Sequence, residues 1–170
     1  WSMTRRLVYR FGFGKADGRA EWNELLGGKG ANLAEMASMG IPVPPGFTIT
    51  TEACVDYLEH SAIPEGLLER VREHMQWLEA GTGKKFGGSD NPLLVSVRSG
   101  ARSSMPGMMD TVLNLGLNGD SVLALARQSR SERFAFDAYR RLLMMFGDVV
   151  LGIERALFDA PLDEARRAIA

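Results

Sequence analysis

The chain has 170 residues, of which 45% are hydrophobic and 24% charged, with twenty basic and twenty-one acidic side chains and a net charge of −1. These values are typical of a globular domain with its own core, and the balanced charge argues against a protein that coats nucleic acid or a membrane surface. Its apolar runs fall short of the roughly 20 residues that a membrane-spanning helix needs.

Strands and helices are predicted to mix from the start of the chain. Residues 5–12 alternate large apolar residues with Val8 and Arg10, which predicts a strand. The glycines that follow, in "GFGKADG", predict a hairpin turn. A helix from Lys29 to Met39 is expected to end at Gly40, which is followed by Ile-Pro.

Two further helices are predicted before the middle of the chain. Residues 43–51 form a short strand entered through prolines, and Thr51 is expected to cap a helix over residues 52–60. Apolar residues at helical spacing over 67–78 predict another helix, and Gly81 is expected to stop it.

The second half of the chain is also predicted to combine strands and helices. "LLVSV" (93–97) predicts a buried strand, and "TVLNLGL" (111–117) another. Asp120 is expected near the start of a short helix. Ser131 is expected to cap a long helix, and the last ten residues to form an arginine-bearing one. This order predicts an α+β fold, a mixed sheet with flanking helices, in one domain spanning residues 1–170.

Neither glycine-rich stretch is a known nucleotide-binding motif. "GFGKADG" spaces its glycines as GxGxxxG, one residue off the dinucleotide fingerprint. "LLGGKGAN" contains Gly-Lys but lacks the leading glycine of a P-loop, and Gly30 stands where that motif needs Ser or Thr.

The second stretch nevertheless has the chemistry of a phosphate site. Gly27 and Gly28 let backbone N–H groups approach a ligand, the following helix directs its positive end to the same place, and Lys29 adds a full charge. A glycine turn that enters a surface helix with a solvated lysine explains the same residues, and the residues alone leave both interpretations open.

A second basic segment begins where "LLVSV" ends. Arg98 follows this strand directly and Arg102 comes four residues later, after small residues; two guanidinium groups at a strand end suit an oligophosphate. The alternative is a pair of exposed arginines in ion pairs. "MPGMMD" (105–110) suits a loop that closes over a ligand, although methionines that simply fill the core are the plainer interpretation.

No catalytic group stands out. His60 and His74 lie on predicted helices without metal-binding partners at useful spacing, and scattered aspartates do not form a metal site. Cys54, the single cysteine, is predicted to be buried and inert, and the lack of any disulfide pair favours a reducing, cytoplasmic compartment.

Five segments in the same order resemble the pyruvate, phosphate dikinase family. They are "LLGGKGANLAEM", "PVPPGFTITTEAC", "GKKFG", "NPLLVSVRSGARSSMPGMMDTVLNLGLN" and "RFAFDAYRRLLMMFGDVV". The resemblance covers Leu7 to about Val150. The related phosphoenolpyruvate synthases resemble the chain at the glycine–lysine segment and at "VRS", but depart from "GARSSMPGMMDT".

The resemblance implies the N-terminal part of an ATP-grasp domain and a set of ATP-binding residues. Lys29 and Arg98 match ATP-contacting residues of the family, Arg102 and Arg141 match basic residues of the site or its docking face, and Met105-Pro106-Gly107 match a loop over the phosphates.

The resemblance also implies what lies outside these residues. The Mg²⁺ ligands, the second ATP-grasp subdomain, the carrier-histidine domain and the pyruvate-binding barrel are expected in the rest of a longer, homodimeric protein. The chain alone is therefore expected to be inactive. Another dikinase with the same front end, such as a phosphoenolpyruvate synthase or a glucan dikinase, and a non-catalytic nucleotide-binding module are the alternatives.

Overall fold

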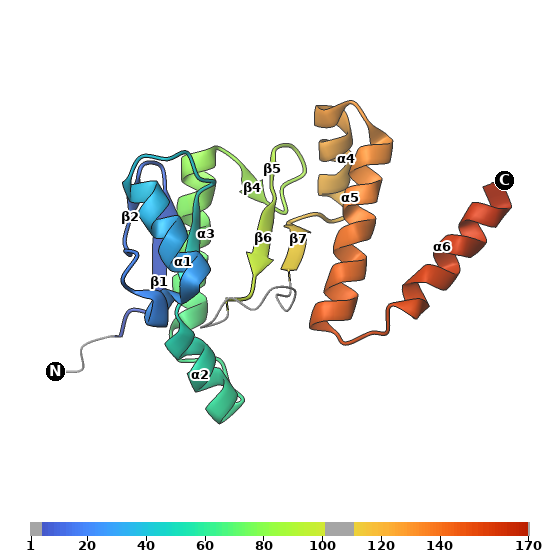
Figure 1. Ribbon diagram of the computed structural model, residues 1–170. Helices are drawn as coiled ribbons and strands as arrows, with labels where there is room; N and C mark the ends of the chain where they lie inside the picture. The colour runs from blue at the N-terminus through green and yellow to red at the C-terminus, as the bar shows by residue number, and fades with distance from the viewer. Residues whose placement is uncertain (1–4, 101–110, 170) are drawn as a thin grey trace. The chain divides into compact units, whose positions relative to one another are not determined.

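The structure, a computed structural model, describes residues 5–100 and 111–169 (Figure 1). It divides into two compact units. Of the described residues, unit 1 comprises those up to Gly83 together with Gly100, and unit 2 comprises residues 84–99 and 111–169.

Unit 1 is a small antiparallel sheet with helices. Its elements are β1 (Val8–Gly12), β2 (Lys15–Ala16), α1 (Asn23–Ser38), β3 (Gly46–Ile49), α2 (Thr51–His60) and α3 (Leu67–Thr82). The strand order is β2-β1-β3, with Phe11 opposite Ala16 on one side of β1 and Val8 opposite Ile49 on the other. The predicted strand is therefore confirmed at the centre of the sheet.

Helices α1 and α3 cover opposite faces of this sheet. Tyr9 meets the ring of Trp22, which precedes α1, with ring centroids 5.8 Å apart. Its neighbour Arg10 lies over the ring of Trp77 in α3, 5.5 Å from the centroid. Successive residues of a strand point to opposite faces, so the two tryptophans mark the two sides of β1.

The predicted hairpin turn joins β1 to β2. Gly12 pairs with Lys15, and the two residues between them, Phe13 and Gly14, have φ of 52° and 74°. Two successive residues with positive φ are the geometry of a type I′ turn, whose twist matches that of the strands. "GFGKADG" thus builds a hairpin.

Two predicted helix boundaries are corrected by the structure. The cap of α2 is Thr50, whose hydroxyl accepts from the backbone N–H of Ala53 at 3.3 Å, while Thr51 donates to the carbonyl of Glu24. Helix α3 passes through Gly81 and ends at Gly83.

Packing explains Gly81, because a Cβ there would lie 2.4 Å from the ring of Phe13. The predicted end of α1 is confirmed: Gly40 has φ of 77°, and the N–H of Ile41 donates to the carbonyl of Met36 at 3.0 Å.

Unit 2 combines short strands with helices. Its elements are β4 (Lys85–Phe86), β5 (Pro92–Leu93), β6 (Val95–Arg98), β7 (Thr111–Leu115), α4 (Gly119–Ser129), α5 (Glu132–Met145), a π-helical segment η1 (Phe146–Val150) and α6 (Ala156–Ile169). Strands β4 and β5 pair in parallel, and β6 and β7 pair antiparallel.

The core of unit 2 lies between β7 and the helix pair α4–α5. Its buried members are Val112, Leu117, Val122, Ala126, Ala135, Ala138 and Leu142. Asn118 caps α4 by accepting from the N–H groups of Asp120 and Ser121, and Ser131 caps α5 by accepting from Phe134, as predicted for Ser131.

The predicted buried strand "LLVSV" is wrong in two respects. The segment is split between β5 and β6, which pair with different partners, and Leu94 lies between them. Val97 is 54% exposed. Only Val95 of β6 is half-buried, whereas Ser96, Val97 and Arg98 are all exposed, so the strand is not a core strand.

The α+β class predicted from the sequence is confirmed, with the described strands divided among three small sheets. Within residues 5–100 and 111–169, no helix is long and apolar enough to cross a membrane.

Candidate functional site

The predicted glycine–lysine site forms a break inside α1. Gly27 has φ of 69° and ψ of 159°, which is not helical, so a first turn ends there and a new helical segment begins at Gly28. A side chain disfavours this conformation, and for this reason the break requires glycine. The prediction that a helix starts near Lys29 is thus met by a restart within a longer helix.

The restart leaves Lys29 at a helix N-terminus. Its side chain is exposed, whereas Gly27 and Gly30 on either side are buried. A Cβ on Gly30 would lie 2.7 and 2.8 Å from the side-chain atoms of Thr48 in β3, so glycine lets α1 approach the sheet. We call Gly27–Lys29 the glycine turn. It presents backbone N–H groups, the positive helix end and a lysine, and all three favour an anion.

Gly100 lies against the glycine turn within unit 1. A Cβ on Gly27 would lie 3.8 Å from the Cα of Gly100, which is an ordinary contact distance, so Gly100 is a neighbour of the turn with room for a methyl group between them. Gly100 stands two residues after Arg98 in the sequence.

Arg98 is the last residue of β6, where it pairs with Thr111 of β7. Its side chain is exposed, as expected for a residue that ends a strand with an open face. Arg98 lies in unit 2 and Lys29 in unit 1, and the convergence of their side chains on one ligand stays a prediction. Arg102, Met105, Pro106 and Gly107 lie outside the described residues.

Arg141 lies on α5 in a small acidic–basic cluster. Its Nε donates to Asp137 at 2.8 Å, and Arg140 donates to the same carboxylate from Nη2 at 2.6 Å. The hydrogen bond from Arg140 is the largest cause that holds the pKa of Asp137 below its ordinary value. Asp137 and Arg141, with Arg133 and Phe134, line a hollow of about 450 Å³ in unit 2.

Magnesium ions prefer carboxylate oxygens, and the glycine turn and the seven predicted site residues include no carboxylate. These residues do not fit a Mg²⁺ site of their own.

A different group of possible metal ligands lies on α2. Asp56, Glu59 and His60 each place one ligand atom within 4.8 Å of the others. The sequence interpretation missed this group, although the i, i+3, i+4 spacing places the three side chains on one face of a helix. Arg5 pairs with Asp56, and His60 Nδ1 contacts the Asp56 carbonyl.

Two other predictions about reactive side chains have different outcomes. Cys54 is exposed, contrary to the predicted burial, because α2 buries only Ala53. His74 lies on a helix as predicted, and its Nδ1 is 2.6 Å from the carbonyl oxygen of Arg70, an arrangement in which the ring nitrogen donates.

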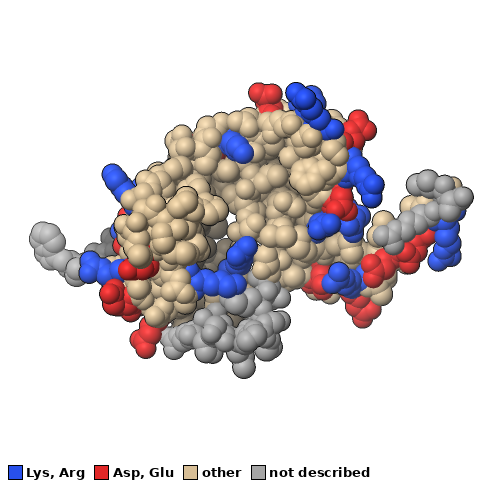
Figure 2. Space-filling model, turned by 45° about the horizontal axis from the view of Figure 1, so that its top comes forward, with Lys and Arg blue, Asp and Glu red and all other residues tan. Residues whose placement is uncertain are grey.

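Charge is mixed over the surface. On the face shown in Figure 2, lysine and arginine side chains alternate with acidic ones and form no continuous basic area. The sequence interpretation overlooked one local group of arginines, Arg6 and Arg10 at β1 and Arg70 in α3. Arg6 and Arg10 are four residues apart in the predicted strand, a spacing that places both side chains on the same face. With a net charge of −1, the attraction of a charged ligand would therefore depend on local groups of charged side chains and not on the electrostatic field of the whole protein.

Comparison with known proteins confirms the resemblance found in the sequence. The family model described as "Pyruvate phosphate dikinase, AMP/ATP-binding domain" matches residues 23–81, which include the glycine turn. A pyruvate, phosphate dikinase from Rhizobium meliloti (strain 1021) is 57% identical over 162 residues, 95% of this chain and 18% of that protein.

Two plant proteins agree. The chloroplastic pyruvate, phosphate dikinase 1 of Zea mays is 53% identical over 97% of this chain and 17% of its own length. Pyruvate, phosphate dikinase 2 of Oryza sativa subsp. japonica is 53% identical over 95% of this chain and 18% of its own length. The chain therefore spans less than a fifth of these relatives.

Proposed function

We propose that this chain is the nucleotide-binding part of a pyruvate, phosphate dikinase. In that enzyme ATP, inorganic phosphate and pyruvate are converted to AMP, pyrophosphate and phosphoenolpyruvate through a phosphohistidine. The observation that carries the proposal is the 53–57% identity to such dikinases over nearly the whole chain. The match to an AMP/ATP-binding domain over the glycine turn supports the assignment of nucleotide binding.

The glycine turn would hold phosphate groups of ATP. The break at Gly27 opens the backbone, the helix restart supplies its positive end, and the exposed Lys29 supplies a point charge. None of these features performs a chemical step. Their role is to bind and orient the polyphosphate, which is the main contribution of a protein to phosphoryl transfer.

Arg98 would complete the site from the end of β6. A guanidinium offers paired bonds to phosphate oxygens, and the side chain of Arg98 is exposed. The resemblance supports this part of the proposal, because Arg98 matches an ATP-contacting residue of the family. Arg102 and the Met105–Gly107 loop would close over the phosphates, and Arg141 would belong to the same basic surface or to its docking face.

Several parts of the reaction must come from elsewhere in a longer protein. We assign Mg²⁺ binding, the remainder of an ATP-grasp fold and the carrier histidine to segments outside this chain. We expect the longer protein to be a homodimer in the cytoplasm, although the plant relatives named above include a chloroplastic one. Because the Mg²⁺ ligands are assigned to segments outside it, the chain alone is expected to bind ATP at most weakly and not to turn it over.

ATP titration tests the proposed site. Arg98→Ala and Lys29→Met each remove one charged contact to phosphate, and we expect each to weaken ATP binding about tenfold. Arg155→Ala removes another exposed arginine of unit 2 and serves as the matched control. Equal ATP affinity in Arg98→Ala, Lys29→Met and Arg155→Ala would refute the assignment.

Labelled inorganic phosphate tests the reaction in the longer protein. A pyruvate, phosphate dikinase incorporates the label into pyrophosphate, because phosphate is its co-substrate. A dikinase that uses water instead, such as phosphoenolpyruvate synthase, makes phosphoenolpyruvate from ATP and pyruvate in the absence of added phosphate. Turnover that is independent of phosphate would exclude the proposed reaction and leave nucleotide binding intact.

A further inference from the structure

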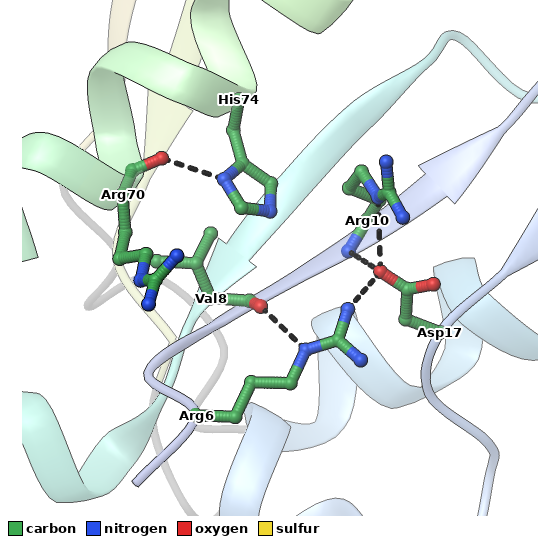
Figure 3. Close-up of polar contacts among 6 residues, drawn as sticks. All are labelled: Arg6, Val8, Arg10, Asp17, Arg70 and His74. Carbon is green, nitrogen blue, oxygen red and sulfur yellow. Dashed lines mark hydrogen bonds and ion pairs between the residues drawn. The ribbon is translucent and has the colours of Figure 1, made fainter. Parts of the chain in front are cut away.

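Unit 1 contains a second basic site, on the face of the sheet opposite α1. A hollow of about 460 Å³ lies between β1 and α3. The residues of this arginine hollow that matter here are Arg6, Arg10, Arg70, Glu73, His74 and Trp77. Figure 3 shows Arg6 and Arg10 on the side of β1, with Arg70 and His74 on the side of α3. Because α1 covers the other face, the arginine hollow is separate from the glycine turn.

Two arginines of the hollow share one carboxylate. Arg6 donates to Asp17 from Nη2, and Arg10 donates to the same oxygen from Nε at 3.1 Å and from its backbone N–H at 3.1 Å (Figure 3). One negative charge balances one of the two guanidinium groups, so one positive charge remains. Within the described residues, both Nη groups of Arg10 are without a partner, and they are the donors that a ligand can use.

A third arginine faces this pair across the hollow. Arg70 donates to Glu73 at 3.1 Å, in a pair whose side chains are 53% and 58% exposed. Exposed ion pairs at this spacing contribute little free energy, so Arg70 can exchange its partner for a ligand. The backbone carbonyl of Arg70 accepts a hydrogen bond from the ring of His74, and the guanidinium of Arg10 lies over the ring of Trp77.

We propose that the arginine hollow binds a dianionic phosphate group, either free inorganic phosphate or the phosphate of a small ester. Guanidinium groups from two elements surround the space, and their planar N–H pairs match the oxygens of a tetrahedral dianion. The surplus positive charge of the Arg6–Arg10 pair provides the attraction, since Arg5, which also lines the hollow, is already paired with Glu52 and Asp56. This site is additional to the one proposed for ATP.

A titration observed at the tryptophans tests the location. Inorganic phosphate, and in a second arm glycerol phosphate, is added at constant ionic strength maintained with sodium chloride, because screening alters such binding. We expect the indole N–H resonance of Trp77 to shift and saturate, and that of Trp22, on the opposite face, to stay in place. Tighter binding of the ester identifies an organic phosphate as the ligand, and tighter binding of the free ion identifies inorganic phosphate.

Two arginines on one helix give a matched pair of variants. Arg70→Gln removes a hollow residue, and we expect a five- to tenfold weaker affinity for phosphate, about one charged hydrogen bond. Arg72→Gln, two residues on, removes an arginine that pairs with Glu69 at 3.6 Å and does not line the hollow. We expect Arg72→Gln to bind as the unchanged chain does.

The ATP site supplies the last control. In Lys29→Met the shift of Trp77 by phosphate should persist while ATP binding weakens, so the two proposals can fail independently. The proposal is overturned if phosphate acts no more strongly than chloride, if Arg70→Gln and Arg72→Gln bind alike, or if the Trp77 shift is lost in Lys29→Met.

Discussion

Unit 1 and unit 2 place their predicted ligand-binding residues in different ways. In unit 1 a central strand is covered on both faces, and glycines set how closely the backbones approach: Gly27 breaks α1 and Gly30 seats it on Thr48. In unit 2 the core lies to one side of a two-stranded sheet, and Arg98 and Arg141 extend from exposed surfaces. The candidate site residues of the first unit depend on backbone shape as well as on Lys29, whereas those of the second unit depend on exposed side chains alone.

The largest effect is expected in the core of unit 2. Leu142→Ala removes a side chain that is 6% exposed within the α4–α5 core, and we expect a loss of about 3 kcal/mol in the free energy of unfolding. Leu143→Ala changes a neighbour that is 50% exposed, and a loss below about 1 kcal/mol is expected. Denaturant unfolding measures both. Similar losses would mean that α5 does not pack as described.

In unit 1 the corresponding test is a glycine. Gly12→Ala introduces a Cβ 2.5 Å from the backbone of Pro45 at φ of 116°, and we expect a loss of about 2 to 3 kcal/mol. Gly14→Ala, in the same hairpin, has φ of 74° but open space, so only the backbone strain of about 1 kcal/mol remains. A smaller loss for Gly12→Ala than for Gly14→Ala would contradict the close approach.

A third pair separates stability from ligand binding at the glycine turn. Gly27→Ala opposes the positive φ, and we expect it to cost about 1 kcal/mol and to weaken ATP binding. Gly28→Ala lies in open space at the start of the helical segment and should be neutral or slightly stabilising. Thermal unfolding and ATP titration of the two variants provide the measurement. Unchanged ATP affinity in Gly27→Ala would remove the turn from the site.

The smallest expected effect is the difference in acid stability between variants of two carboxylates, Asp17 and Asp137. Partial burial alone would raise the pKa of Asp17, but hydrogen bonds from Arg10 and the charge of Arg6 outweigh it, and the pKa is lowered from the ordinary 3.8. The stability contributed by Asp17 is therefore fully present above pH 3.8 and is lost as the pH falls through the lowered pKa.

Asp17→Asn should lower stability at pH 7 by about 1 kcal/mol and flatten the acid limb of the stability curve. The pKa of Asp137 is lowered as well, first by the hydrogen bond from Arg140, but its side chain is 39% exposed, compared with 22% for Asp17. Asp137→Asn should therefore change the curve less than Asp17→Asn. Unfolding measured between pH 2 and 7 decides, and a steeper effect of Asp137→Asn would reverse the ranking of the two sites.

Local signals predicted the fold best. Alternation identified β1, Ser131 and Gly40 marked helix ends, and the glycines near residue 27 marked a helix start. Predictions failed where burial depends on distant partners. "LLVSV" is apolar enough for a buried strand, yet Ser96 and Val97 of β6 are exposed, and Cys54 lies on a helix that buries little. Gly81 has the chemistry of a helix stop but serves a contact with Phe13, more than sixty positions earlier in the chain.

For the charged sites, too, local features could be predicted from the sequence and contacts between distant residues could not. The sequence predicted the charge and the glycine of the turn, because phosphate chemistry needs both. It did not predict that Asp17 serves two arginines, since that depends on a hairpin bringing residue 17 beside residues 6 and 10.

Strand β1 separates an aromatic contact with Trp22 from a cationic contact with Trp77 through the alternation of Tyr9 and Arg10. A one-residue slip of β1 would exchange the two environments at once, placing the guanidinium of Arg10 under α1 and the phenol of Tyr9 under α3. We therefore expect a single-residue insertion in β1 to be far more disruptive than a substitution on its exposed edge.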